Sequence, residues 1–199
     1  MNGALVYNDY LNLLKEKKII GIINKKSQIQ PSSIDLSLSD ECYEIYASFL
    51  SAKSKVRYKL KKISLKKINL QKPKIFKKNK TYIVRLNERL KLNNSLYGHC
   101  NPKSTTGRLN IFCRIILDNC DEYEKIPNGY KGEMFLEVTS RSFDIKISEG
   151  DKLNQMRLVN NSNTYISDVN LIKIHNKKQL IFSRKINFID NGLKLSVDL

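Results

Sequence analysis

The amino-acid sequence predicts an all-β fold, a sandwich or a barrel, that begins with one short helix. Many short segments rich in β-branched and aromatic residues follow one another, separated by turn-forming residues. Helical spacing appears near the N-terminus, where Tyr10, Leu11 and Leu14 follow Asn8, a residue suited to cap a helix. No linker divides the 199 residues. We therefore expect a single domain, which at this length buries about 70% of its unfolded surface.

The first strand is expected within Gln28–Leu38, where apolar and polar residues alternate: Ile34, Leu36 and Leu38 against Ser33, Asp35 and Ser37. This places Asp35 on the polar face of a half-buried strand, and Cys42–Tyr46 is expected to pair with it. The remaining strands are expected at Thr81–Leu86, Leu109–Leu117, Glu133–Val138, Phe143–Ile147, Gln155–Val159 and Val169–Ile174, with a loop at Asp121–Tyr130 that ends in the turn Pro127–Gly129.

Composition argues against a membrane protein and a zinc protein. The chain has no run of about 18 apolar residues and no basic region ahead of an apolar core at its start, so we expect a soluble, cytoplasmic protein. Two histidines and four cysteines without a C-x-x-C pair indicate reduced structural thiols rather than zinc ligands: Cys42, Cys100, Cys113 and Cys120. The H-x-E and C-x-x-C pattern of zinc deaminases is absent.

The formal net charge of +17 is concentrated in one segment. Lys53–Lys80 contains thirteen Lys or Arg residues and no acidic residue. Such a run is either an electrostatic footprint for nucleic acid or a solvated, lysine-rich insertion. Aromatic residues do not interleave with it as stacking platforms would, which favours the insertion and makes nucleic acid an unlikely partner. The sign of the charge predicts an anionic partner.

The segment Asn101–Arg108 is the strongest candidate for a binding site. Its eight residues combine Lys103, three adjacent hydroxyls, a glycine and Arg108, a set of donors that suits phosphate or carboxylate. It lacks the G-x-x-x-x-G-K-[ST] spacing, so it is not the P-loop of nucleoside triphosphatases. The alternative interpretation is a polar surface turn with a helix cap.

Three further polar residues have ordinary explanations when each is taken alone. Alternation puts Glu137 on a face of its strand with Glu133 and Phe135, opposite Met134, Leu136 and Val138, so pattern alone predicts a solvated carboxylate. Asp35 is expected to point outward next to turn serines. Gln155 is expected to be a polar strand residue after a β-turn.

Taken together and in order, four motifs resemble dCTP deaminase: Pro31–Leu36, Lys103–Arg108, Gly129–Glu137 and Gly150–Gln155. That family belongs to the trimeric dUTPase-like superfamily, whose fold is a distorted β-sandwich of the jelly-roll type. Asn101–Arg108 and Lys152–Arg157 are most similar to the N-terminal half of a long bacterial variant, which carries two dUTPase-like modules in one chain. The resemblance covers essentially the whole sequence.

The resemblance implies a catalytic group of three residues. Glu137 matches the carboxylate of a deaminase that works without zinc, where it takes a proton from water so that hydroxide attacks C4 of cytosine. Ser104 matches a residue that positions this water, and Arg108 matches an arginine that reaches into the catalytic pocket. It also implies a homotrimer with sites between subunits.

The resemblance further implies how the triphosphate is held. Lys103, Ser104 and Thr105 match the stretch that binds the phosphates, and Gln155 matches a glutamine near them. Asp35 matches an aspartate that supports a magnesium ion on the phosphates through water. No zinc is implied.

The sequence departs from the family in three places. Pro127 stands where many single-module relatives have an acidic residue that contacts the deoxyribose, and Lys103 stands where the family usually has arginine. Residues 1–192 are expected to form one module, and residues 193–199 the start of a truncated second one. Ser196–Leu199 echoes the Ser33–Leu36 motif.

Three functions remain open on the sequence. The first is a dCTP deaminase that yields dUTP and ammonia, or a bifunctional form that continues to dUMP. The second is a nucleotide-binding or regulatory module that needs a separately encoded second half for catalysis. The third is a nucleic-acid-binding β-domain that uses Lys53–Lys80.

Overall fold

The computed structural model describes residues 3–160, 166–181, 189 and 192–194. It divides the chain into two units, residues 3–161 and 162–199. One module over residues 1–192 stays a prediction. The start of a second module at residue 193 stays a prediction, because residues 195–199, with the Ser196–Leu199 motif, lie outside the described residues. None of the described helices is long and apolar enough to cross a membrane.

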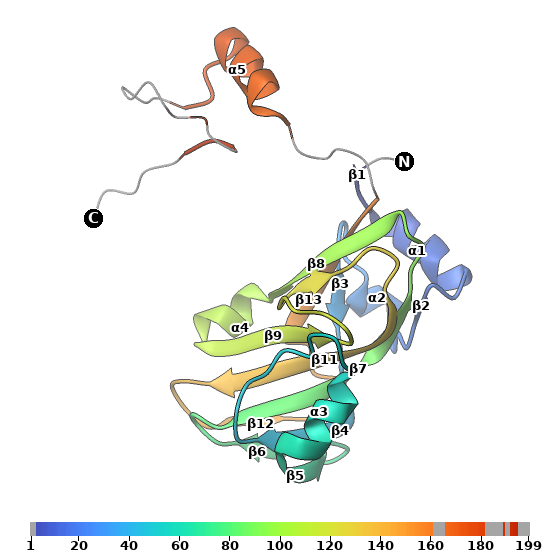
Figure 1. The fold of residues 1–199 in the computed structure, drawn as a ribbon, viewed down its shortest axis with the longest axis vertical. Helices are drawn as coiled ribbons and strands as arrows, with labels where there is room; N and C mark the ends of the chain where they lie inside the picture. The colour runs from blue at the N-terminus through green and yellow to red at the C-terminus, as the bar shows by residue number, and fades with distance from the viewer. Residues whose placement is uncertain (1–2, 161–165, 182–188, 190–191, 195–199) are drawn as a thin grey trace. The chain divides into compact units, whose positions relative to one another are not determined.

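The first unit contains most of the secondary structure (Figure 1). Its helices are α1 (Tyr7–Lys15), α2 (Lys25–Gln28), α3 (Val56–Ile63) and α4 (Ser104–Arg108). Its strands are β1 (Gly3–Ala4), β2 (Ile19–Ile20), β3 (Ile34–Leu36), β4 (Leu38–Ile45), β5 (Ser64–Asn69), β6 (Lys74–Phe76), β7 (Thr81–Lys91), β8 (Leu96–Pro102), β9 (Ile111–Leu117), β10 (Lys125–Ile126), β11 (Lys131–Ser140), β12 (Ile145–Ile147) and β13 (Asn154–Asn160).

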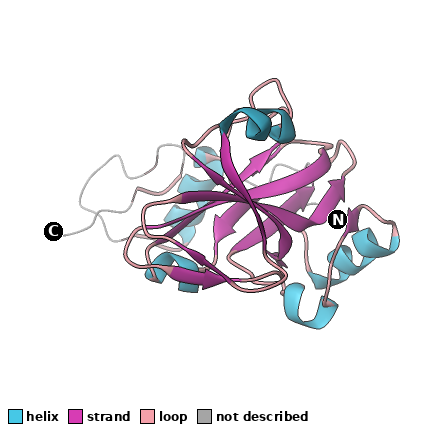
Figure 2. Cartoon of the chain, turned by 90° about the horizontal axis from the view of Figure 1, so that it is seen from below, coloured by secondary structure: helices cyan, strands magenta, loops and turns pink. Residues whose placement is uncertain are grey.

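These strands form two main antiparallel sheets, and in Figure 2 they cross one another at the centre of the unit. The five-stranded sheet has the order β1-β13-β8-β10, with β3 also paired to β13. The six-stranded sheet has the order β5-β4-β7-β11-β9, with β2 also paired to β7, and β6 pairs with β12 in a separate ribbon. The main core includes side chains from both sheets, such as Ile34, Cys100, Leu136 and Met156. The predicted all-β sandwich with a short N-terminal helix is confirmed.

A second apolar cluster lies on the other face of the six-stranded sheet. Its buried members are Ile45, Val56, Leu60, Ile83, Ile116 and Phe135. Val56 and Leu60 come from α3, which packs near β4, so the middle of this sheet is covered on both faces. The lysines of Lys53–Lys80 are largely solvated, as predicted, but the segment is more than a surface insertion. Four of its apolar residues are buried in the fold: Val56, Leu60, Leu70 and Phe76.

Two acidic side chains that were predicted to be exposed are buried, for different reasons. Phe135 and Glu137 share the face of β11 that lies under the α3 cluster, and Glu137 is only 3% exposed. Asp35 is 4% exposed, because β3 is buried on both of its faces. For both β11 and β3, strand alternation correctly separated the two faces. The face that was expected to be solvated is covered by segments distant in sequence.

Three local predictions also differ from the structure. The strand at Cys42–Tyr46 exists as part of β4, but it pairs with β5 and β7, whereas β3 pairs with β13. The first helix starts at Tyr7, and Asp9 rather than Asn8 supports its N-terminus by accepting a hydrogen bond from Val6 N at 2.9 Å. Val169–Ile174 is not a strand and lies inside a helix.

That helix, α5 (Asp168–Lys177), belongs to the second unit. Ser167 caps it by accepting a hydrogen bond from Asn170 N at 3.4 Å, and Asp168 lies in its first turn. A serine cap with an acidic first turn favours a helix strongly enough to outweigh the strand preference of its β-branched residues.

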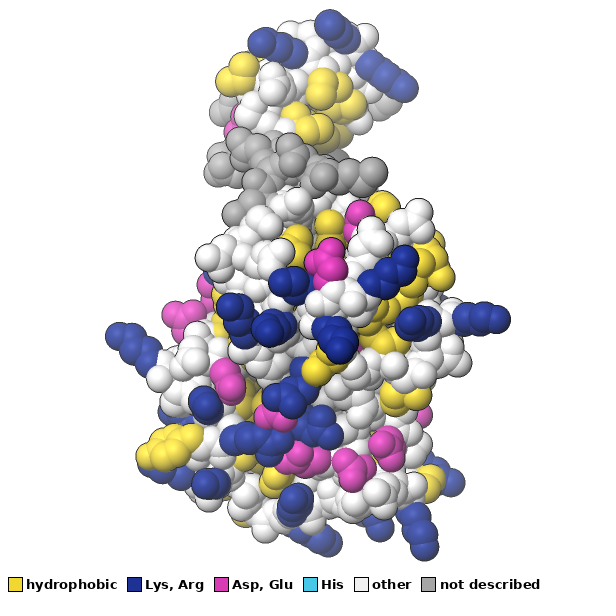
Figure 3. Space-filling model, turned by 90° about the vertical axis from the view of Figure 1, so that its right-hand side faces the viewer, with side chains coloured by type: hydrophobic (Ala, Val, Ile, Leu, Met, Phe, Trp, Pro, Cys, Tyr) yellow, Lys and Arg dark blue, Asp and Glu magenta, His cyan; other side chains and the backbone are white. Residues whose placement is uncertain are grey.

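The described surface is strongly basic. Figure 3 shows Lys and Arg side chains spread over one whole face, with Asp and Glu between them. The four cysteines are free and buried, so they contribute to the core.

Candidate functional site

Three of the predicted phosphate-site residues lie together at one end of the five-stranded sheet. In the registers of β13, Gln155 stands opposite Asp35 on β3 and opposite Asn101 on β8. Lys103 follows the end of β8 and donates from its backbone N to Leu153 O at 2.9 Å. Its side chain forms an ion pair between Nζ and Oδ2 of Asp35. Residues from three parts of the sequence thus meet around one buried carboxylate.

The hydroxyl-rich segment after Lys103 forms α4, a single short helical turn between β8 and β9 (Figure 1). Lys103 is its N-cap residue, and Gly107 N donates to Lys103 O at 3.1 Å. Ser104, Thr105 and Arg108 are exposed, whereas Thr106 is buried. The turn therefore presents two hydroxyls and a guanidinium to solvent beside the Lys103–Asp35 pair, as an anion site requires.

A buried polar network fixes the backbone around Asp35. Gln28 Nε2 donates to Asp35 O at 2.9 Å and to Glu88 Oε1 at 2.6 Å. Ser37 donates to the same carboxylate from N at 3.0 Å and from Oγ at 2.7 Å. Burial raises the pKa of Glu88, although these hydrogen bonds oppose the shift. The network holds β3 in place from the side opposite β13. The sequence analysis did not identify Glu88. The sequence feature that could have indicated it is an acidic residue inside the long, largely apolar strand β7.

Glu137 lies in the other sheet, on β11, and its main partner is Arg114. In the β9–β11 register the two residues stand opposite one another. Arg114 donates to Glu137 Oε1 from Nε at 3.1 Å and from Nη2 at 2.5 Å. Burial alone lowers the pKa of Arg114, but the hydrogen bond with Glu137 and the negative charge of Glu137 together raise it overall. The arginine seen at this carboxylate is thus Arg114, a residue that the sequence analysis did not single out.

The second carboxylate oxygen of Glu137 is in a different situation. Oε2 is buried and accepts no hydrogen bond from any residue that the structure describes. Buried acceptors of this kind are rare in folded proteins, and each one points to an ordered water, a ligand or a catalytic role. The carboxylate therefore has one oxygen held by Arg114 and one buried oxygen without a donor among the described residues.

Glu124 is a second carboxyl group that sequence reasoning missed. It adopts a left-handed backbone conformation with φ of 62° and lies along the free edge of β9, where its Oε1 accepts from Ile115 N at 3.0 Å. Asn154 Nδ2 lies 3.4 Å from both of its oxygens. Burial raises the pKa of Glu124 to about 7, despite the hydrogen bonds from Ile115 and Asn154. Glu124 thus titrates near neutral pH.

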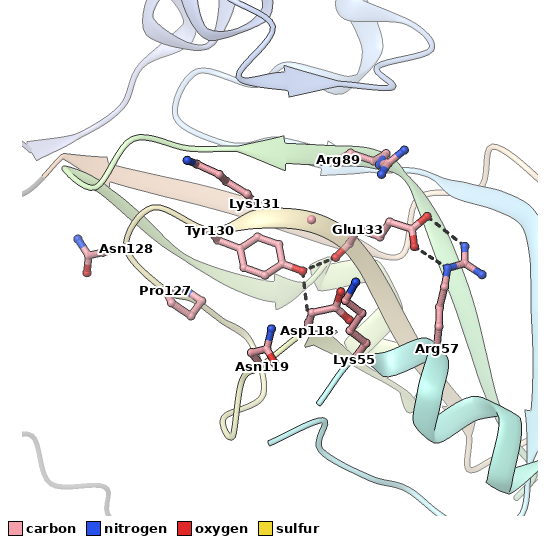
Figure 4. Close-up of a pocket in the computed structure, with 11 residues that line it drawn as sticks. Lys55, Arg57, Arg89, Asp118, Asn119, Pro127, Asn128, Tyr130, Lys131 and Glu133 are labelled. Carbon is pink, nitrogen blue, oxygen red and sulfur yellow. Dashed lines mark hydrogen bonds and ion pairs between the residues drawn. The ribbon is translucent and has the colours of Figure 1, made fainter. Parts of the chain in front are cut away.

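A pocket of about 460 Å³ adjoins the turn where Pro127 stands (Figure 4). Tyr130 Oη lies on its wall, accepting from Asp118 N at 3.2 Å and donating to Glu133 O at 2.5 Å. Arg57, on α3, pairs with Glu133 at one side of the pocket, with Nε 2.6 Å from Oε2, and also pairs with Glu41. Lys55, Arg89 and Lys131 line it as well. The pocket is cationic and polar, with Pro127 supplying no acidic group to it.

A magnesium ion at Asp35 would need most of its ligands from the phosphates of a bound nucleotide. Asp35 supplies a single carboxylate, and Lys103 already pairs with one of its oxygens. Within the described ranges, no three His, Cys, Asp or Glu side chains gather as a metal-binding group. Magnesium in nucleotide sites is usually bound by one or two carboxylates together with substrate phosphates, so this donor set suits that arrangement.

The first unit is thus an antiparallel sandwich that carries a lysine- and hydroxyl-bearing turn between β8 and β9. Residues 1–162 match the family described as the 2'-deoxycytidine 5'-triphosphate deaminase (DCD) N-terminal domain, and the chain belongs to this family. No curated protein sequence matches the chain.

Among solved structures, the chain is similar to 2'-deoxycytidine 5'-triphosphate deaminase from Agrobacterium tumefaciens, with a TM-score of 0.82 and 33% identity. The match covers 89% of this chain and 54% of that one, so this chain spans about half the length of that protein. Lower similarity is found to the dUTPase of EIAV, with a TM-score of 0.37, 17% identity and coverage of 50% and 78%. The dUTPase of the Staphylococcus aureus phage phi11 gives a TM-score of 0.36, 13% identity and coverage of 48% and 76%.

Proposed function

We propose that the chain binds dCTP and catalyses its zinc-independent hydrolysis to dUTP and ammonia in the cytoplasm. The observation that carries this proposal is Glu137. In the motif resemblance it matches the family's catalytic carboxylate. It is buried, and its Oε2 accepts no hydrogen bond from the described part of the chain. Such an oxygen is suited to accept a proton from water.

Phosphate binding falls to the group around Lys103. Lys103 supplies a point charge, Ser104 and Thr105 supply hydroxyl donors, and Gln155 supplies an amide at the same end of the sheet. When bound with the nucleotide, magnesium neutralises phosphate charge, and Asp35 is the carboxylate available to support it through water. The ammonium group of Lys103 must then interact with both Asp35 and the phosphates.

In the proposed reaction, Glu137 takes a proton from water, and the hydroxide forms a bond to C4 of the cytosine ring. Glu137 passes this proton to N3, and the proton of the new C4 hydroxyl then passes to the amino nitrogen. The C4–N4 bond breaks as the C4 carbonyl forms, and ammonia leaves. Ser104 positions the water, and Arg108 reaches into the pocket to stabilise the charge that develops on the ring. Water and dCTP thus give dUTP and ammonia, with no oxidant or reductant needed.

Assembly is part of the proposal. The Lys103 group and Glu137 lie in different sheets of this chain, so we propose a homotrimer in which neighbouring subunits complete each site. A closed oligomer that shares its sites in this way uses identical interfaces around one axis.

One observation favours a second candidate, a nucleotide-binding module that needs another half for catalysis. The chain spans about half of the A. tumefaciens protein. In that case the Lys103 group binds the triphosphate while the chain alone releases no ammonia. A bifunctional enzyme that continues to dUMP remains a variant of the first proposal.

Ammonia release from dCTP tests the proposal and separates the candidates. The wild-type chain is expected to release ammonia, and Glu137→Gln to lose about 10²–10⁴ in rate while still binding dCTP, because glutamine cannot accept the proton. Titration calorimetry with magnesium should show tighter binding of dCTP than of dCMP. Zinc chelation should leave the rate unchanged, and removal of magnesium should raise KM.

The outcomes are distinct. Full activity of Glu137→Gln refutes the assigned chemistry, and equal affinity for dCTP and deoxycytidine refutes the phosphate site. Binding without ammonia release supports the module. Analysis of the product by chromatography separates dUTP from dUMP.

A further inference from the structure

Glu137 belongs to a cluster that extends beyond the family's catalytic residues. Arg114 directs two donors, Nε and Nη2, at the same oxygen, Oε1 of Glu137. The guanidinium carbon of Arg114 lies 4.0 Å from the centre of the Tyr123 ring, a cation–π contact at short range. The Glu137 side chain is 4% exposed and that of Arg114 is 42% exposed, so Arg114 separates the carboxylate from solvent.

The guanidinium is itself held from several sides. Nη2 of Arg114 lies 3.4 Å from Ser48 Oγ, and Tyr123 Oη donates to Phe49 O at 3.3 Å. Residues 48 and 49 thus hold both Arg114 and the ring beside it. A planar group stacked on an aromatic ring and tied at its edge has little rotational freedom, so it fixes the orientation of the carboxylate that it binds.

We propose that Arg114 is a positioning residue for Glu137, with Tyr123 supporting it. Arg114 holds Oε1, and this directs Oε2 to the donor that the protein does not supply, which is the attacking water. This inference rests on the proposed deaminase function. It explains why a buried carboxylate keeps one unpartnered oxygen: a second protein donor on Oε2 would occupy the atom that accepts the proton.

The two donors on a single oxygen distinguish arginine from lysine at this position. A lysine retains the positive charge but has no planar fork and does not stack on Tyr123 in the same way. If orientation matters more than charge, Arg114→Lys will be nearly as impaired as Arg114→Gln. If charge alone matters, lysine will restore most of the rate.

The test is steady-state ammonia release by Arg114→Gln, Arg114→Lys and Tyr123→Ala, with Lys77→Gln as the control. Lys77 forms an exposed pair with Asp144 and takes no part in the site. We expect both Arg114 variants to lose about 10–10² in kcat with KM changed less than about threefold, because misplacing a reacting group by about 1 Å costs this much. Tyr123→Ala should fall between them and the wild type, and added guanidinium ion should restore part of the Arg114→Gln rate.

Each result assigns a role. Wild-type kcat in Arg114→Gln overturns the inference, and so does a raised KM with unchanged kcat, which would make Arg114 a substrate-binding residue. Full rescue by lysine overturns the orientation argument. If Arg114→Gln fails to fold by circular dichroism, Arg114→Lys and Tyr123→Ala decide the question. A wild-type chain that releases no ammonia refutes the proposed function and this inference with it, whereas active Arg114 variants refute the inference alone.

Discussion

Lys103, at the start of α4, forms an ion pair with Asp35 on β3, sixty-eight residues earlier in the chain. The Asp35 side chain is 5% exposed and that of Lys103 is 29% exposed. The cation proposed to bind phosphate therefore also neutralises a buried carboxylate. Binding of a nucleotide must share or move this lysine, so phosphate affinity and local stability are linked through one side chain.

Lys103→Ala is expected to lower the free energy of unfolding by about 1–3 kcal/mol, because it leaves Asp35 buried without its cation. The double variant Lys103→Ala/Asp35→Asn should recover part of that loss, since no charge then remains unpaired. Urea unfolding measures both. Lys77→Ala, which breaks an exposed pair, is the matched control and should change stability by less than about 0.5 kcal/mol. A Lys103→Ala chain as stable as the wild type would show that the pair contributes nothing to folding.

Mixing two inactive chains tests the proposed division of the site between subunits. Lys103→Ala keeps Glu137, and Glu137→Gln keeps the phosphate turn. If each site takes one part from each neighbour, random mixed trimers contain intact sites at about one quarter of positions. We expect ammonia release near a quarter of the wild-type rate after co-refolding. Light scattering should give a trimer mass. Trimers without recovered activity would place both parts of each site in the same chain, and a monomer would contradict the proposed assembly.

Glu124 makes stability depend on pH in a predictable direction. Its pKa rises from 4.5 in the unfolded chain to about 7 in the fold, so the folded state holds a proton that the unfolded state has lost between these values. Its contribution is full below about pH 4.5 and is lost as the pH rises through 7. The difference in stability between the wild type and Glu124→Gln should therefore fall by about 1–3 kcal/mol from pH 4.5 to 8. A difference that does not vary with pH would mean that Glu124 is ionised throughout.

The helix α3 is expected to be part of the folding unit rather than a dispensable basic segment. Leu60 is 3% exposed within the α3 cluster, so Leu60→Ala should lower stability by about 2–4 kcal/mol. Lys61 is exposed on the same helix, and Lys61→Ala should change stability by less than about 0.5 kcal/mol. Thermal unfolding by circular dichroism compares the two. Equal, small effects would restore the solvated-insertion interpretation.

Much of the fold was predictable because strand alternation is a local property. The strands at Thr81, Leu109, Glu133 and Gln155 are present, although their ends differ by several residues. The strand β8 was missed because Gly98, His99 and Pro102 weaken its pattern. The helix α3 was missed because its many lysines suggested solvent, although Val56 and Leu60 have helical spacing.

Some residues of the candidate site were likewise predictable from the sequence, and others were not. The order of the motifs led to Lys103, Asp35 and Gln155 as one group, and strand register brings these residues together. Arg114 and Glu124 were not singled out, since neither belongs to a recognisable motif. A lone arginine in the apolar strand Ile111–Leu117 was the available signal, because a charge in a buried strand requires a partner.

The sequence by itself determined which residues alternate between strand faces, where the lysine- and hydroxyl-bearing turn lies, and to which family the motifs belong. These follow from short motifs, each read within a few neighbouring residues, and from the order of the motifs along the chain. Only the tertiary structure decided that the second face of β11 is covered by α3, and that the arginine opposite Glu137 is Arg114. Cover and register depend on contacts between segments far apart in sequence, which a pattern with a period of two residues does not contain.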